Sequence, residues 1–146
     1  MLRWVLFSCW TVFILYSMDF FKPSESQLVG TIAQWFVEKL NLPPQTPAKL
    51  FHWWVYFVWS LLFAGALARG YWRTLSARDL ATCVGGLIVF GALTEGLQHF
   101  CLGRTPALPD FAYNLFGGAL GLCFRSVASR LVQARRSGPQ GCSYPR

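Results

Sequence analysis

The chain has 146 residues, of which 54% are hydrophobic and only 13% are charged, and its formal net charge is +7. This composition, with no long polar stretch, excludes a separate polar domain and indicates a membrane protein of one domain. The positive charge does not require nucleic acid as a partner, because nothing resembling an RNA- or DNA-binding module accompanies it.

Four apolar runs predict four transmembrane helices in an all-α, polytopic membrane protein. In chain order they cover Trp4 to Met18, Leu50 to Ala68, Leu80 to about Leu102, and Phe111 to about Phe124. The first and fourth runs are short for a hydrocarbon core of ~30 Å, which needs ~20 residues, so we expect them to extend to Phe20 and Val127. A three-helix arrangement is the alternative. We expect the first run to be a retained anchor and not a signal peptide, because no small-residue cleavage site precedes Met18.

The segment between the first two runs, about residues 20–49, predicts an amphipathic helix in the outer membrane interface. Its apolar residues recur at helical spacing, and Ser24 and Gln27 form a capping-box pattern before them. Trp35 suits an interfacial anchor. Pro43 and Pro44 end the segment.

The basic residues predict the orientation of the bundle. One side receives nine of the 13 Lys and Arg residues, namely Arg3, Arg69, Arg73, Arg78, Arg125, Arg130, Arg135, Arg136 and Arg146. The other side receives Lys22, Lys39, Lys49 and Arg104, so the positive-inside rule places both termini in the cytoplasm. We therefore expect a membrane domain over residues 1–127 and a disordered, basic cytoplasmic tail over residues 128–146, with some attraction to membrane lipids.

Polar residues gather at the outer ends of the last three predicted helices. The second helix begins with His52 and Tyr56, the third ends with Glu95 and Gln98, and the fourth begins with Asp110 and Asn114, just after Arg104. Charged groups in hydrocarbon cost roughly 2.5–3.5 kcal/mol on insertion scales, so such groups usually face a bundle interior or a wet cavity. The pattern predicts either an outward-facing pocket or a polar network between helices. Gly117 and Gly121 form a small-residue strip that predicts close helix packing.

The order and spacing of these residues resemble the VanZ-like membrane proteins. The family pattern is matched by Lys49, His52, Tyr56, Glu95, Gln98, Arg104, Asp110, Asn114, Gly117 and Gly121. The resemblance covers residues 49–121, and Ala48 departs from it because the family often has Asp before the Lys. It implies a protein of the cell envelope in the bacterial inner (cytoplasmic) membrane, and a fold more firmly than a reaction.

The chemistry of the predicted pocket suits binding of a polar head group, of a lipid-linked or glycopeptide-like molecule. His52, Tyr56, Glu95, Gln98, Arg104, Asp110 and Asn114 are the candidate ligand-binding or polar-network residues. The alternative is a small accessory subunit that packs against a larger membrane protein complex. No catalytic residues are assigned, and a non-catalytic role is favoured. The five cysteines show no paired motif, and a site from His52, Glu95, His99 and Asp110 has only weak spacing, so we expect no metal or cofactor.

Overall fold

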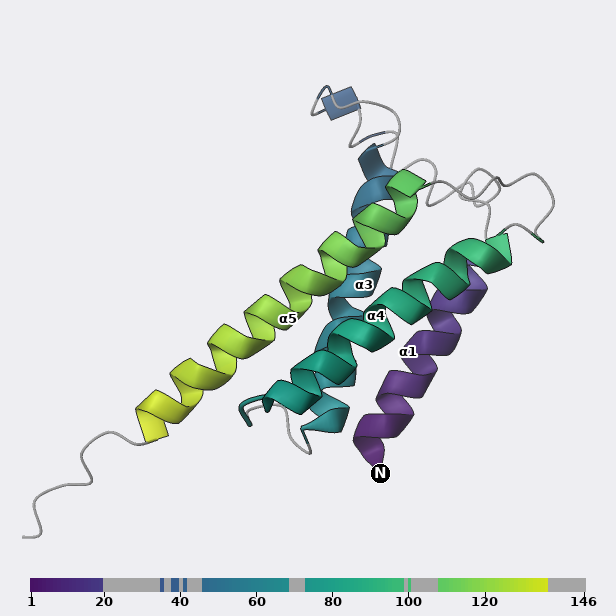
Figure 1. The fold of residues 1–146 in the computed structure, drawn as a ribbon. Helices are drawn as coiled ribbons and strands as arrows, with labels where there is room; N and C mark the ends of the chain where they lie inside the picture. The colour runs from purple at the N-terminus through teal and green to yellow at the C-terminus, as the bar shows by residue number, and fades with distance from the viewer. Residues whose placement is uncertain are drawn as a thin grey trace, which may run out of the picture.

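The computed structural model describes residues 1–19, 35, 38, 39, 41, 46–68, 73–98, 100 and 108–136. Four long helices make up this part of the chain: α1 (Leu2–Asp19), α3 (Thr46–Leu67), α4 (Ala77–Gln98) and α5 (Leu108–Arg136) (Figure 1). No strand occurs among the described residues, as the apolar runs predicted.

Three of the helices, α3, α4 and α5, are long and apolar enough to cross a membrane. The fourth, α1, has a shorter apolar stretch over Leu2–Tyr16. The chain is therefore an all-helical membrane protein, and four complete crossings stay a prediction. In the predicted interfacial segment before α3, the described residues are Trp35, Glu38, Lys39 and Asn41. The first three are helical and exposed, and Asn41 is an exposed turn residue. The other residues of this segment lie outside the described part.

The helices form a bundle in which α3 and α4 lie between α1 and α5 (Figure 1). Both middle helices contact α1 and α5 as well as each other, and the most extensive contact joins α3 to α5. The chain reverses between successive helices, so α3 begins, α4 ends and α5 begins at one end of the bundle, opposite the N-terminus (Figure 1). This arrangement places the polar segments of three helices at the same end.

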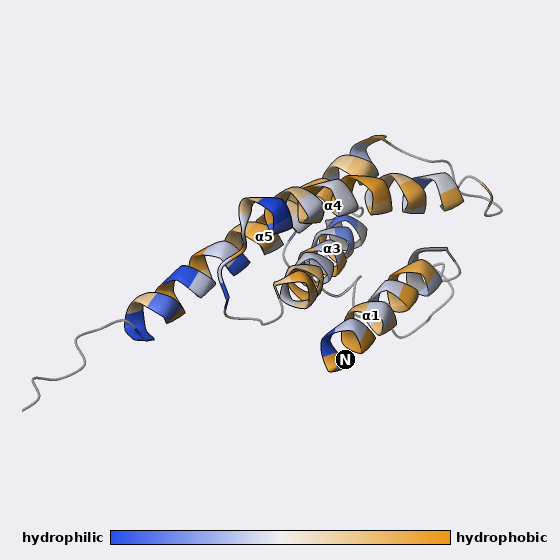
Figure 2. Ribbon diagram, turned by 60° about the horizontal axis from the view of Figure 1, so that its bottom comes forward, coloured by the Kyte–Doolittle hydropathy of each residue, from blue (hydrophilic) through white to orange (hydrophobic). Residues whose placement is uncertain are grey.

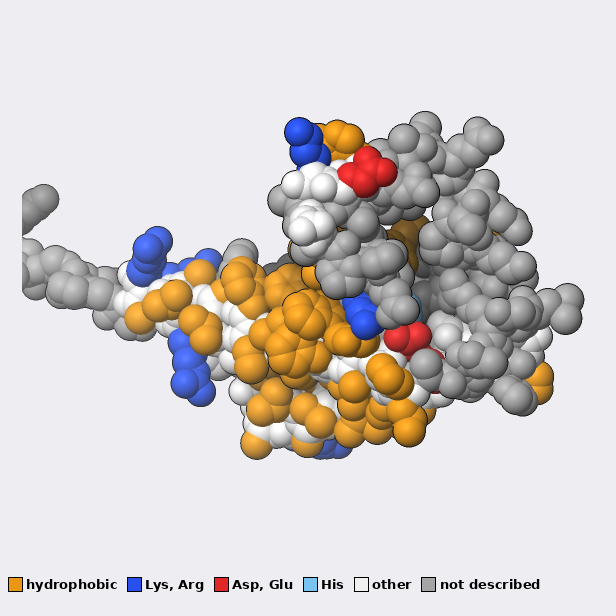
Figure 3. All heavy atoms as spheres, turned by 90° about the horizontal axis from the view of Figure 1, so that it is seen from above, with side chains coloured by type: hydrophobic (Ala, Val, Ile, Leu, Met, Phe, Trp, Pro, Cys, Tyr) orange, Lys and Arg blue, Asp and Glu red, His pale blue; other side chains and the backbone are white. Residues whose placement is uncertain are grey.

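Aromatic residues make up much of the core between α1, α3 and α4. Trp59 stacks on Phe90 with ring centroids 5.0 Å apart, and Phe7 stacks on Phe63 at 4.9 Å. The indole of Trp10 donates to the carbonyl of Val55 at 3.1 Å, so its N–H is satisfied inside the bundle. Many other large apolar side chains are exposed, as expected where a bundle faces lipid (Figure 3).

Glycines bring α3 and α5 close together. A Cβ built on Gly117 would meet the backbone of Trp53, and one on Gly121 would lie 2.5 Å from the carbonyl oxygen of Phe57. Gly118, between them, faces Leu87 of α4 as well as Ser60 of α3. The predicted small-residue strip is therefore a packing surface, and its main partner is α3.

Side chains from α4 and α5 hold the residues just before α4. Ser76 and Asp79 form a reciprocal cap at the start of α4: the Ser76 hydroxyl donates to the Asp79 carboxylate at 2.7 Å, and the Asp79 N–H donates to the Ser76 hydroxyl at 3.1 Å. From α5, the buried guanidinium of Arg125 donates to the carbonyl of Arg73 at 2.9 Å. The cap and this bond hold the start of α4 beside α5.

The last helix is longer than its apolar run predicted. It continues past the expected domain end at residue 127 to Arg136, so residues 128–136 belong to α5, whereas we had expected a disordered tail there (Figure 1). Helix propensity explains the difference, because Leu131, Ala134 and the arginines are good helix formers and the first breakers, Gly138 and Pro139, come later. Residues 137–146 lie outside the described part.

Candidate functional site

A chain of hydrogen bonds links α3, α5 and α4 at the end of the bundle opposite the N-terminus. Asn114 is completely buried at its centre. Its amide nitrogen donates to Glu95 Oε1 at 3.2 Å, and its amide oxygen lies 2.8 Å from His52 Nδ1. Three residues that are far apart in sequence, one from each helix, thus form one connection, which is buried at Asn114 and Glu95 and half-buried at His52.

The partners of Asn114 determine which groups donate and which accept in this series of hydrogen bonds. An amide oxygen can only accept, so His52 Nδ1 must carry the proton that it shares with Asn114. The neutral imidazole then has its lone pair on Nε2, the other ring nitrogen. Asn114 therefore orients the His52 ring and sets its tautomer, while Glu95 holds the Asn114 amide.

Tyr56 belongs to a second hydrogen-bonded group, one helical turn along α3 from His52. The Thr94 hydroxyl donates to the carbonyl of Gly91 at 2.9 Å, so its oxygen accepts from the Tyr56 hydroxyl at 2.5 Å. Thr94 is fully buried and was not among the predicted site residues. The sequence offered only a weak signal for it, its position next to Glu95, because a threonine in a helix commonly bonds its own backbone.

Gln98 lies one turn further along α4 than Glu95 and on the same side of the helix. Its side chain is only 3% exposed, yet its amide nitrogen makes no hydrogen bond with the residues that the structure describes. A buried amide donor without an acceptor costs roughly 1–3 kcal/mol, so this group has an unused capacity to donate. We call His52, Glu95, Gln98 and Asn114 together the polar site.

The remaining predicted residues lie around the polar site or outside the described residues. Asp110 is half-buried in the first turn of α5, where a carboxylate interacts favourably with the helix dipole. The Lys49 ammonium lies 5.2 Å from the ring centre of Tyr113, at the same end of α3 and α5. Arg104 and His99 are outside the described part of the chain, so their predicted positions are not tested.

The polar site is equipped for binding by hydrogen bonds. It combines an oriented imidazole, a buried carboxylate and an amide donor that no described residue uses. Within the described ranges, no group of three or more His, Cys, Asp and Glu side chains is placed to hold a metal ion. The arrangement thus brings hydrogen-bond donors and acceptors together at one end of the bundle.

Comparisons with protein-family models, with curated proteins and with solved structures gave no match to the chain. The fold and the buried polar site therefore define the class, a small helical membrane protein with a polar cluster at one end of its bundle.

Proposed function

We propose that the chain is a VanZ-like integral membrane protein of the cell envelope that binds a polar head group, lipid-linked or glycopeptide-like, at the polar site. The observation that carries this proposal is the series of hydrogen bonds from His52 through Asn114 to Glu95, with a Gln98 amide beside it that no described residue uses. All four residues occupy positions of the VanZ-like pattern. The proposed location is the bacterial inner membrane with both termini in the cytoplasm, which places the polar site at the outer surface.

A packing role alone would leave one feature of the polar site unexplained. Interhelical hydrogen bonds in membrane proteins give only about 0.6 kcal/mol on average, while a buried donor without a partner opposes folding. A ligand oxygen that accepts from the Gln98 amide would remove this cost. Lys49, beside Tyr113 at the same end of the bundle, adds a positive charge near the site for an anionic group such as a diphosphate.

Gln98→Leu is expected to weaken ligand binding about 10- to 100-fold while the protein stays folded. A hydrogen bond that involves a charged partner gives about 1.5–3 kcal/mol. Among the described residues, no protein group loses a bond from the Gln98 amide nitrogen in this variant. The measurement is a titration of the purified protein in mild detergent with two probes, a polyprenyl diphosphate and the glycopeptide teicoplanin. Thermal unfolding of the same samples reports on folding.

A matched control for this substitution is Thr82→Val, at the other end of α4. Thr82 is exposed and donates only to the Arg78 carbonyl at 2.9 Å, so its loss should change neither probe's affinity. Unchanged binding by Gln98→Leu, or no binding of either probe by the wild-type protein, would count against the proposal.

The second candidate function is that of a small accessory subunit of a larger membrane protein complex. It is favoured by the exposed face of α4, where Ala81, Gly85, Ala92 and Gly96 recur and a Cβ on either glycine would meet nothing within 4 Å. Small residues at such spacing let the transmembrane helix of another protein approach closely. Under this alternative, we expect the protein to copurify with a stable membrane partner in mild detergent, and Gly85→Leu to release that partner. A wild-type protein that purifies alone as a monomer would contradict it.

A further inference from the structure

The end of α5 extends beyond the rest of the bundle. The helix has 29 residues, which corresponds to about 44 Å at 1.5 Å per residue, whereas a hydrocarbon core is about 30 Å thick. Figures 1 and 2 both show its C-terminal turns projecting past the other helices. We call residues 127–136 the α5 arm.

The apolar surface of α5 continues onto the arm. Five side chains at spacings of three or four residues share one face of the helix: Phe116, Leu120, Phe124, Val127 and Leu131. All five are exposed, and the last two, on the arm, are 58% and 61% exposed. This apolar face therefore continues the lipid-facing surface of the bundle onto the arm, and it does not pack inside the protein.

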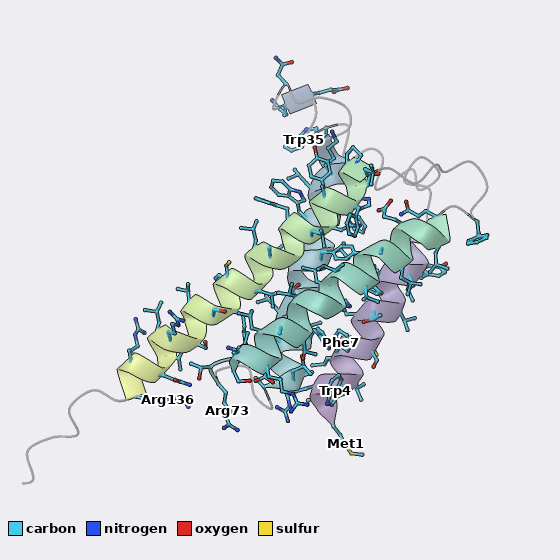
Figure 4. All side chains as sticks on the ribbon, viewed as in Figure 1. Met1, Trp4, Phe7, Trp35, Arg73 and Arg136 are labelled. Carbon is cyan, nitrogen blue, oxygen red and sulfur yellow. The ribbon has the colours of Figure 1, made fainter. Side chains whose placement is uncertain are left out.

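The arm is also strongly basic. Arg130, Arg135 and Arg136 are all exposed on it, and Figure 2 shows the hydrophilic residues of α5 gathered at this end. No Asp or Glu follows Asp110 anywhere in the sequence, while five Arg residues do. These charges have no acidic neighbours along their own helix, and Arg73, labelled with Arg136 in Figure 4, lies at the same end of the bundle.

We propose that the α5 arm binds the head groups of anionic phospholipids at the membrane surface. A helix with an apolar face and flanking arginines can bury Val127 and Leu131 among acyl chains while its guanidinium groups reach lipid phosphates. Each basic residue near an anionic leaflet contributes about 1 kcal/mol, so the arginines select charged lipid over neutral lipid. This lipid contact is separate from the polar site, which lies at the opposite end of the bundle.

The test measures how much lipid the protein retains in detergent, by native mass spectrometry. It compares titrations with dioleoylphosphatidylglycerol, which is anionic, and dioleoylphosphatidylcholine, which has no net charge. The wild-type protein is expected to retain phosphatidylglycerol preferentially. The double substitution Arg135→Gln and Arg136→Gln is expected to lower this preference roughly 10- to 30-fold, because two groups of about 1 kcal/mol are lost. Leu131→Gln should weaken retention of both lipids, because it interrupts the apolar face and leaves the charges in place.

The matched control removes two arginines from the same end of the bundle but not from the arm, through Arg3→Gln and Arg78→Gln. It should keep most of the preference for phosphatidylglycerol. An equal loss in the control would show that net charge alone selects the lipid and would overturn the proposal. The proposal would also be overturned if the wild-type protein retained both lipids equally, or if duplex DNA displaced phosphatidylglycerol from the arm.

Discussion

Gly117→Ala is expected to force α3 and α5 apart and to lower the thermal stability of the purified protein strongly. The new methyl group would meet the Trp53 carbonyl oxygen and would lie 2.7 Å from its Cα and 2.9 Å from its carbonyl carbon. These are backbone atoms, so no side-chain rotation can make room, and the two helices must separate along their main contact. Overpacking usually costs about 1–3 kcal/mol, and a clash with backbone belongs at the upper end of that range.

Gly85→Ala is the control for this prediction, because it makes the same chemical change where a Cβ meets nothing within 4 Å. It should leave stability unchanged or raise it by up to about 1 kcal/mol, since alanine favours a helix over glycine. Thermal unfolding followed by circular dichroism in one detergent compares the two variants. Equal melting temperatures for Gly117→Ala and the wild-type protein would contradict the backbone contact between α3 and α5.

The glycine spacing predicted a packing surface but could not identify its partner. Gly117 and Gly121 are four residues apart, which places them on one side of a helix whatever lies against that side. The rotation of α5 in the bundle determines that α3 is the neighbour and that Gly118 reaches Leu87 of α4. This rotation depends on the packing of all the helices together, which local spacing does not encode.

The same limit applies to the polar residues. The topology predicted that three polar pairs come to one end of the bundle. The structure joins one member of each pair by hydrogen bonds, namely His52, Glu95 and Asn114, and Gln98 lies beside Glu95 on α4. The other members differ in their surroundings. Tyr56 bonds to Thr94 and Asp110 is half-buried in the first turn of α5, because residues four apart on a helix lie at different depths. Arg104, another candidate residue of the predicted pocket, is outside the described residues.

The end of α5 was predicted wrongly for a different reason. The hydropathy of the sequence falls after Phe124, and an apolar run measures only the part of a helix that suits hydrocarbon. Backbone hydrogen bonds continue through polar residues as long as helix formers follow, as they do here to Arg136. A count of apolar residues therefore gives the length of the membrane-spanning part and underestimates the length of the whole helix.

Asn114→Leu is expected to be the most destabilising substitution in the polar site. It removes the acceptor of the His52 Nδ1–H and the donor to Glu95 Oε1 in one step, at a position with no exposed surface. A buried polar group that loses a hydrogen bond costs about 1–3 kcal/mol, and the half-buried His52 adds less than the buried Glu95. We therefore expect a loss of about 1–4 kcal/mol and a marked fall in the melting temperature in detergent. Binding at the polar site should be lost as well, because the His52 ring is no longer oriented.

A double-mutant cycle with Glu95→Leu separates the hydrogen bond from simple packing. If Asn114 and Glu95 stabilise each other through their bond, the double variant with two leucines should lose about 0.5–3 kcal/mol less than the sum of the single variants. The reason is that each single substitution leaves a buried polar partner behind, whereas the double substitution removes both groups. Losses that simply add would show that the two side chains act independently, and the interpretation of Asn114 as the centre of the polar site would then be wrong.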